Sequence, residues 1–419
     1  LSFSKNNIIN GSNVIDGLLF FTDNLNEPRV IDIEKFKFYS KSLVDSDGTI
    51  SKNSSTKIAT SNSGLRDLIE EDITVAVISP QTSPTIEIKD SLREGIVSTL
   101  LANHNFFSTG QGTNNKLILP NDQNNTFRIN YSANLDWKIG DNISFEPTGD
   151  LDDFSAIATI KDIELNPTII TFQILSYINA DNIENKNYEI EQELIEDDPI
   201  YELKFPRFGY RWKYDDNRFS TFSPFSETAF FPDEFEYDGK KGFNKGIINR
   251  AKRIILKDID QGSDRVKQID LLLKFDDDNN VYILESKKKK YIDANYIFEI
   301  TKEQIKSTVD NKQLLRQWDN IPKRAKTQEI TGNRIIYGNY FQNYNIYDDP
   351  KFQITLTGRD DNLKRSLKSN RNYEIGVVYV DKFNRQTPVL SDDSGSYFIN
   401  KNQAPNQNAF NIKLTNNPP

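Results

Sequence analysis

The chain has 419 residues, of which 36% are hydrophobic and 11% aromatic, and it carries a formal net charge of -9. It has no cysteine and a single histidine, His104, so disulfides, cysteine nucleophiles and multi-histidine metal sites are excluded. A Ser-His-Asp triad would have to use His104 as its base. The acidic balance disfavours binding to nucleic-acid phosphates, which needs clustered lysine and arginine.

The length predicts roughly two to four domains. The chain starts at Leu1 and has no methionine, although translation needs one, so we expect an ordered or processed part of a longer protein. The sequence contains neither a signal peptide nor an apolar run of about 18 residues, and no membrane span is predicted.

The first part of the chain, residues 1–84, is predicted to be a β segment of the main body. Apolar runs on either side of a polar turn at 22–28 are typical of paired strands. The polar stretch 40–62 predicts a loop, and Ser63 is a favourable N-cap for a short helix through Ile69. The expected strands are residues 18–21, 29–33 and 73–78.

Residues 85–198 have a different sequence pattern from the rest of the chain, and this pattern predicts an inserted small β-barrel. Short apolar runs alternate with turn residues at regular spacing, as in small barrels. Trp137 precedes a Gly140-Asp141 turn similar to that of SH3-like and oligonucleotide-binding barrels. The acidic stretch 190–199 predicts a linker back to the main body. The expected strands are residues 116–119, 126–131, 142–145, 156–160 and 169–175.

Residues 199–330 predict a fibronectin-like β-domain with a short helix. Alternating apolar residues in the hairpin 269–284 share one face of a sheet. Thr301 is the expected N-cap of a helix that carries Ile305 and Val309.

Residues 331–419 predict a second β-domain. Its expected strands are residues 332–340, 352–356 and 373–380. The chain as a whole is therefore expected to be mainly β and multi-domain. Fibronectin-like β-sandwich and β-hairpin modules, an inserted small β-barrel and one or two short helices would build it.

Two segments far apart in the chain match each other, residues 210–226 and 376–391. Each is an apolar or aromatic run, then an Asp-led polar turn, then a return through small hydroxyl residues and proline. This pattern predicts a strand, a tight turn and a second strand. A unit that recurs within one chain indicates repeated β-domains, and such chains are more often structural than catalytic.

Two short motifs fall short of a metal or cofactor site. In the acidic stretch 276–280, an EF-hand would need glycine and glutamate where Val281 and Lys287 stand, so a solvated hairpin turn is expected. Gly110 and Gly112 lack the third glycine and the strand-helix context of a dinucleotide site, so a loop is expected.

The remaining polar residues show no catalytic pattern. His104 has no patterned carboxylate or nucleophile beside it, and a structural or exposed role is expected. The basic run 287–290 is expected to be a solvated strand end rather than a contact to DNA or lipid. Carboxylate pairs such as 197–198 and 348–349 do not single out a glycosidase pair. We predict no catalytic, cofactor-binding or metal-binding residue, no cofactor and no enzymatic activity.

Several of these segments, taken in order, resemble the muzzle, or tail-nozzle, protein of crAss-like short-tailed bacteriophages. They include the motifs LLFFTD at 18–23 and NIPKRA at 320–325. The other similar segments are residues 28–29, 210–226, 269–284, 333–339 and 379–384. The resemblance spans most of the main body, not the barrel at 86–190, and its motifs are structural turns rather than active-site signatures.

The resemblance implies a virion component at the distal end of a short tail. Such nozzles are homo-oligomeric rings, commonly of six copies, that dock beneath adaptor rings and form the last part of the channel for double-stranded DNA and ejected proteins. Assembly in the host cytoplasm suits a cysteine-free chain, because that compartment is reducing. An acidic channel lining would repel DNA and let it pass.

Two other functions stay open. A surface adhesin or glycan-binding β-sandwich would present an exposed Trp or Tyr platform. The chain has only three tryptophans, Trp137, Trp212 and Trp318, and two of them lie in strand or helix patterns that indicate a core. A glycan-degrading tail enzyme would need a carboxylate pair across a cleft.

Overall fold

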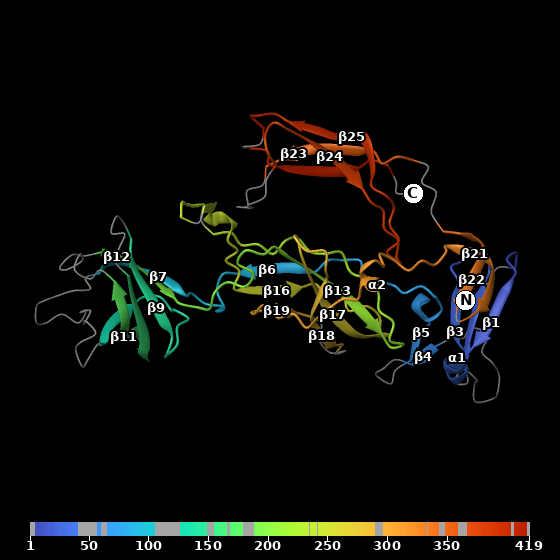
Figure 1. The fold of residues 1–419 in the computed structure, drawn as a ribbon, viewed down its shortest axis with the longest axis horizontal. Helices are drawn as coiled ribbons and strands as arrows, with labels where there is room; N and C mark the ends of the chain where they lie inside the picture. Colours follow the sequence, from blue (N-terminus) through green and yellow to red (C-terminus); the bar gives the residue numbers. More distant parts are fainter. Residues whose placement is uncertain are drawn as a thin grey trace, which may run out of the picture.

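The fold is mainly β, as the sequence predicts. Antiparallel sheets build most of the computed structural model, and its described part contains two short α-helices. The half-barrel (green) lies at one end of the long axis and the N-terminal sheet (blue) at the other (Figure 1). The residues that the structure describes are 5–40, 57–59, 65–104, 126–148, 155–165, 168–178, 188–233, 235–240, 242–289, 296–332, 334–342, 348–358, 367–403 and 406–416.

The N-terminal sheet confirms the first two predicted strands. Its strands in order are β1 (Gly11–Ile15), β2 (Leu18–Thr22) and β3 (Arg29–Asp32). The elements that follow are α1 (Ile33–Ser40), β4 (Lys57–Ala59), β5 (Leu65–Asp67) and a 3-10 turn (Glu70–Asp72). The helix predicted from Ser63 is wrong, because residues 65–67 form the extended strand β5, which pairs with β4. The predicted loop at 40–62 lies largely outside the described residues.

The segment 73–78 is largely buried, but the strand predicted there is wrong. A single bridge connects it to β3, and its N–H groups bind to different partners. The Val75 N–H donates to the Pro28 carbonyl at 3.2 Å. The Val77 N–H donates to the Asp319 carboxylate at 2.8 Å. The segment therefore ties the N-terminal sheet to a distant loop instead of extending a sheet.

Two sheets pack face to face as a central β-sandwich. The first has the order β13 (Pro206–Tyr214), β17 (Val266–Phe275), β18 (Tyr282–Lys288) and β20 (Ser307–Thr308). The second has the order β19 (Phe298–Ile300), β16 (Arg253–Lys257) and β6 (Thr85–Lys89). Alternate residues of β13, Phe208, Tyr210 and Trp212, share one face and pack in one core with Leu256 and Phe298.

Serine hydroxyls bind the return segment of the first hairpin to β13. The pairs are Ser220 with Trp212, Ser223 with Tyr210 and Ser226 with Phe208. In each pair the serine N–H donates to the carbonyl of the aromatic residue, and the N–H of the aromatic residue donates to the serine Oγ at 2.9 Å. We call these contacts the serine ladder. The serines recur every third residue and the aromatic residues every second, so the return segment is not the regular strand that was predicted.

The second hairpin repeats this arrangement. Asn217 and Asn384 occupy the same place in their turns and both have positive φ, 65° and 63°. A three-residue loop that ends in such a residue is a common hairpin connection. Thr387 takes the place of Ser220: its N–H donates to the Tyr379 carbonyl, and its Oγ1 accepts from the Tyr379 N–H, both at 3.1 Å. The predicted repeat is thus present at the level of individual hydrogen bonds.

The predicted barrel is a half-barrel of six strands. Their order is β7 (Ser98–His104), β12 (Tyr188–Leu194), β9 (Asn142–Pro147), β10 (Ser155–Glu164), β11 (Thr168–Ile178) and β8 (Thr126–Tyr131). Aromatic rings fill its core, and the Phe172 ring lies 5.1 Å from Phe127 and 5.3 Å from Phe145. In the described residues, β7 and β8 do not pair with each other, so the sheet stays open. The strand predicted at 116–119 lies outside the described residues.

The first half of the predicted acidic linker 190–199 is in fact part of the half-barrel, and only residues 195–199 connect it to the sandwich. Residues 188–194 form β12, with Ile190, Gln192 and Leu194 buried. The glutamates between them face solvent, so the acidic composition belongs to one face of a strand. At the start of the region predicted to be the barrel, 85–198, strand β6 pairs with β16 and therefore belongs to the sandwich.

The two chain segments that connect the half-barrel to the sandwich are held together by Glu196. This side chain is 6% exposed. Its Oε1 accepts from the Ser91 hydroxyl and the Leu92 N–H, both at 2.9 Å. Its Oε2 lies 3.3 Å from the Lys252 ammonium of the sandwich. The outgoing and returning connections therefore leave the sandwich side by side.

The remaining strands form hairpins and small sheets. They are β14 (Tyr237–Asp238), β15 (Phe243–Asn244), β21 (Arg324–Thr331), β22 (Arg334–Phe341), β23 (Phe352–Thr357), β24 (Arg371–Val377), β25 (Leu390–Ile399) and β26 (Ala409–Leu414). The hairpin β21-β22 packs on the N-terminal sheet, where Gln328 donates to Asn13 at 3.2 Å. The pairs β23-β26 and β24-β25 form the C-terminal module, drawn in red in Figure 1.

The helix predicted from Thr301 is wrong in position. Residues 307–308 form β20 and pair with β18, so the chain is extended there. The helix α2 (Asn311–Leu314) starts later, and the Asp310 side chain caps it by accepting from the Lys312 N–H at 3.0 Å.

Candidate functional site

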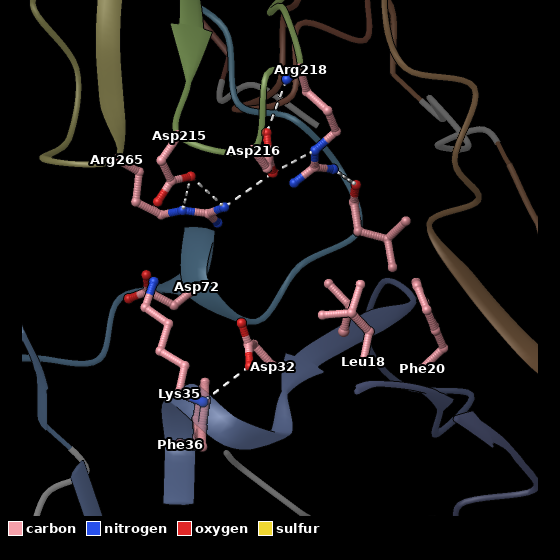
Figure 2. A pocket seen from close by; sticks show the side chains of 12 residues that line it. Leu18, Phe20, Asp32, Lys35, Phe36, Asp72, Asp215, Asp216, Arg218 and Arg265 are labelled. Atoms are coloured by element: carbon pink, nitrogen blue, oxygen red, sulfur yellow. Dashed lines mark hydrogen bonds and ion pairs between the residues drawn. The ribbon is translucent and has the colours of Figure 1, made fainter. Parts of the chain in front are cut away.

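A cavity of about 550 Å³ lies between the N-terminal sheet and the turn of the first hairpin (Figure 2). Its lining residues are Leu18, Phe20, Val30, Asp32, Lys35, Phe36, Asp72, Val75, Asp215, Asp216, Arg218 and Arg265. One wall comes from β2, β3 and α1 and combines apolar side chains with Asp32 and Lys35. The other wall comes from the segment 72–75, the hairpin turn and Arg265, the residue before β17, so distant parts of the chain form the site together.

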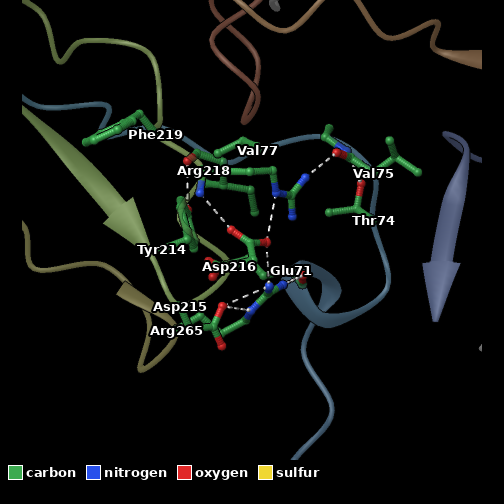
Figure 3. A network of polar contacts seen from close by, with 12 residues as sticks. Glu71, Thr74, Val75, Val77, Tyr214, Asp215, Asp216, Arg218, Phe219 and Arg265 are labelled. Atoms are coloured by element: carbon green, nitrogen blue, oxygen red, sulfur yellow. Dashed lines mark hydrogen bonds and ion pairs between the residues drawn. The ribbon is translucent and has the colours of Figure 1, made fainter. Parts of the chain in front are cut away.

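The turn at 215–218 positions charged residues of this second wall. The Asp216 carboxylate accepts from the Arg218 N–H at 3.0 Å and from its Nε at 2.8 Å. The Arg218 Nη1 donates to the Val75 carbonyl at 3.0 Å (Figure 3). The turn therefore binds the segment that comes from the N-terminal sheet.

Arg265 binds both carboxylates of the turn. Its Nη2 lies 3.1 Å from Asp215 and 3.2 Å from Asp216, and its Nη1 donates to the Glu71 carbonyl. Burial would lower the pKa of Arg265, but the two carboxylates outweigh this and hold it above its ordinary value. Burial would raise the pKa of Asp216, but hydrogen bonds and charge from Arg218 hold it below its ordinary value.

The turn of the second hairpin docks at the same place. The Asn384 amide donates to the Thr221 hydroxyl at 3.1 Å, and Phe383 is 1% exposed. Arg385 repeats the role of Arg218: its Nε donates to Asp381 at 2.6 Å, and its Nη2 lies 3.1 Å from Glu27 of the N-terminal part.

A fourth segment, the loop after α2, completes the contact. The Arg316 Nη1 donates to the Phe219 carbonyl at 2.8 Å, and its Nε donates to Asp319 at 2.8 Å. Asp319 in turn accepts from the Val77 N–H. We define the junction as the segments 70–79, 215–222, 316–321 and 381–385 together with Arg265.

The chemistry of the junction is cohesion between modules. Its arginines bind carboxylates and backbone carbonyls at the same time, which the several N–H donors of the planar guanidinium allow. Within the described part of the chain, no cluster of histidine, cysteine and acidic residues could hold a metal ion. The helices described there are also too short to cross a bilayer.

The residues that the sequence singled out lie elsewhere, and several have structural partners. Gly110 and Gly112 lie outside the described residues, as does the His104 side chain. The acidic stretch 276–280 is a turn in which Asp278 accepts from the Asn280 N–H at 2.9 Å. Asp197 and Asp198 are exposed.

The basic run is built into the sandwich. The Lys287 ammonium lies 4.2 Å from the Phe298 ring centroid. The Lys289 ammonium donates to the carbonyls of residues 261–263 at 2.7–2.9 Å. Residue 290 lies outside the described part.

The sequence did not indicate that the charged residues of the junction connect separate parts of the chain. The available signal was the repeat itself, because Asn217-Arg218 and Asn384-Arg385 both follow an aspartate in the turn. Comparisons with family models, curated proteins and solved structures found no match to this chain.

Asp216→Asn is expected to weaken the junction in a pH-dependent way. Because the folded-state pKa of Asp216 is lowered, its stabilising contribution is complete above the ordinary carboxyl pKa and is lost as pH falls through the lowered value. Thermal unfolding should therefore separate variant from parent at about pH 6, and the two should converge towards about pH 2.5. Asp277→Asn, at an exposed turn residue, is the control and should change little at either pH. A separation that stays constant with pH would contradict the role of the carboxylate charge.

Proposed function

We propose that this chain is a non-enzymatic structural component of a bacteriophage tail. It would form a homo-oligomeric ring, commonly of six copies, at the distal nozzle, or muzzle, and bind other tail and adaptor-ring proteins. Double-stranded DNA and ejected proteins would pass through the ring. Copies would assemble in the host cytoplasm and reside in the virion.

The observation that carries this proposal is the repeated hairpin whose two turns enter one junction. Each turn presents an asparagine with positive φ followed by an arginine. Each arginine binds an aspartate of its own turn and donates to a backbone carbonyl of another segment, Arg218 to Val75 and Arg385 to Ile321. Four distant segments are thereby bound to one another through short, charge-assisted contacts. A wall of stiff β-modules needs this kind of connection, because it must keep its shape while cargo passes.

Charge on the half-barrel also supports a conduit for DNA. Glu191 of β12 lies directly opposite Glu146 of β9, and both are exposed. Like charges in this position destabilise a sheet, so the fold bears a cost to keep an acidic face. Such a face would repel a polyanion rather than retain it.

The test is the assembly state of the isolated chain. Mass photometry and negative-stain electron microscopy should show closed rings of uniform copy number. A chain that stays monomeric at every concentration would overturn the proposal.

The alternative is a phage or bacterial surface adhesin that binds glycans. Trp137 and Trp212, which are 5% and 3% exposed, lie in the two cores, and Trp318 is half-buried. A sugar platform would therefore have to come from other aromatic residues. Specific signals on a glycan array would favour this alternative.

A further inference from the structure

A short hairpin projects from the central sandwich and carries exposed aromatic residues. We call it the aromatic finger and define it as residues 235–240 and 242–245, which include β14 and β15. Phe235, at its start, is 89% exposed and Tyr237 is 69% exposed. Tyr237 begins β14, and Phe235 lies two residues before it. Large aromatic side chains exposed on a projection are typical of protein–protein contacts.

The base of the finger lies at the half-barrel end of the sandwich. Arg250 lies 3.6 Å from Asp233, at the foot of the finger, and 3.8 Å from Asp90, where the chain leaves for the half-barrel. The Ala229 N–H, just before the finger, donates to the carbonyl of Pro206, the first residue of β13.

The cavity lies at the other end of β13. This strand ends at Tyr214, and the cavity wall begins with Asp215 and Asp216. Nine residues of strand separate the two features, a distance of roughly 30 Å. The finger of one molecule therefore cannot fill the cavity of the same molecule.

The cavity has the features of an acceptor for this finger. Leu18, Phe20 and Phe36 give the cavity apolar lining on the side of the N-terminal sheet, next to Asp32 and Lys35 (Figure 2). The volume of about 550 Å³ lies in the range of pockets that hold small ligands and single side chains.

The charges of the two features are opposite in sign. Four carboxylates and three cations line the cavity, which leaves one net negative charge. In the sequence, the stretch 235–245 has three lysines, of which residue 241 lies outside the described part, against Glu236 and Asp238, which leaves one net positive charge.

We propose that the aromatic finger of one copy inserts Phe235 and Tyr237 into the cavity of the next copy. The inference rests on the proposed ring and names the contact that builds it. A projection and a hollow at opposite ends make a heterologous, head-to-tail interface, and such interfaces close into rings when the rotation between copies allows it. The cavity, with its net negative charge, would face the net positive finger.

Cysteine pairing in the full chain tests the contact directly, because the natural sequence has no cysteine. Phe235→Cys and Leu18→Cys variants are mixed and oxidised. If finger and cavity meet, the mixture should form disulfide-linked pairs at least about tenfold more readily than a control mixture, because binding raises the effective concentration. The control replaces Phe235→Cys by Phe398→Cys, a site 51% exposed on β25.

A second variant measures the contribution to assembly. Phe235→Ser/Tyr237→Ser should weaken self-association by at least about thirtyfold, as expected for interface hot spots. Phe398→Ser is the matched control and should leave assembly unchanged.

The outcomes separate the two proposals. Rings that persist in Phe235→Ser/Tyr237→Ser, with no disulfide between positions 235 and 18, overturn the finger contact and leave the nozzle proposal standing. Disulfides formed only between two Phe235→Cys copies indicate a two-fold contact and also overturn it. A monomer at all concentrations overturns both.

Discussion

Asp270→Ala is expected to destabilise the central sandwich by about 3–5 kcal/mol, because it leaves a buried arginine without its counter-charge. Arg211 of β13 and Asp270 of β17 lie directly opposite each other on neighbouring strands. Their side chains are 6% and 2% exposed, and the Arg211 Nε lies 3.0 Å from the Asp270 Oδ2. The guanidinium lies over the Phe219 ring at 4.1 Å, and Gln268 donates to the second carboxylate oxygen at 2.6 Å. The loss should appear as faster amide hydrogen exchange in β13 and β17.

An exposed ion pair provides the control. Arg128 and Glu164 of the half-barrel are 49% and 51% exposed, so Glu164→Ala should cost about 1 kcal/mol or less. Peptides of the half-barrel in Asp270→Ala should exchange as in the parent chain. The double replacement Arg211→Met/Asp270→Leu should recover much of the stability, because no buried charge remains. A small effect of Asp270→Ala would show that water reaches Arg211.

Ser223→Ala should destabilise the sandwich by about 1–3 kcal/mol, because it leaves a buried N–H without an acceptor. The Ser223 Oγ accepts from the Tyr210 N–H at 2.9 Å and donates to the Pro224 carbonyl at 3.0 Å. Alanine keeps the Ser223 N–H bond to the Tyr210 carbonyl, so the hairpin should retain its path. Denaturant unfolding followed by hydrogen exchange of β13 measures the difference.

Ser307→Ala, at an exposed residue of β20, is the control and should stay within about 0.5 kcal/mol of the parent. Combining the alanine replacements at positions 220, 223 and 226 should cost more than any one of them. If Ser223→Ala loses as little stability as Ser307→Ala, the serine hydroxyl does not stabilise the hairpin, and the backbone hydrogen bonds alone hold the return segment to β13.

Much of the fold was predictable where side chains follow the period of a strand. The strand 126–131 follows the alternation of apolar residues that burial on one face requires. In β17 the alternate residues from Ile269 to Phe275 share the core face as predicted, although Asp270 and Leu272 on the other face are also buried. The failures occurred where partners came from far along the chain. Residues 73–78 look like a buried strand, but their N–H groups bind to Pro28 and to Asp319. The local sequence does not indicate such contacts between distant parts of the chain.

The junction was less predictable than the fold. The repeat was visible, and it drew attention to aspartates and small hydroxyl residues whose roles the hydrogen bonds now explain. Arg265 gave no signal, because it gains its role only when β17 places it beside the turn at 215–218. Charged residues that join modules look like ordinary surface residues until the modules are placed.

The two connections held by Glu196 have a consequence for engineering. Because the outgoing and returning chains leave the sandwich next to each other, the half-barrel is attached like a domain inserted into a surface loop. Exchange or deletion of such an insert need not alter the path of the host chain. This position is therefore a place to graft a foreign domain, for example an affinity tag or a fluorescent reporter, while the rest of the molecule keeps its connectivity.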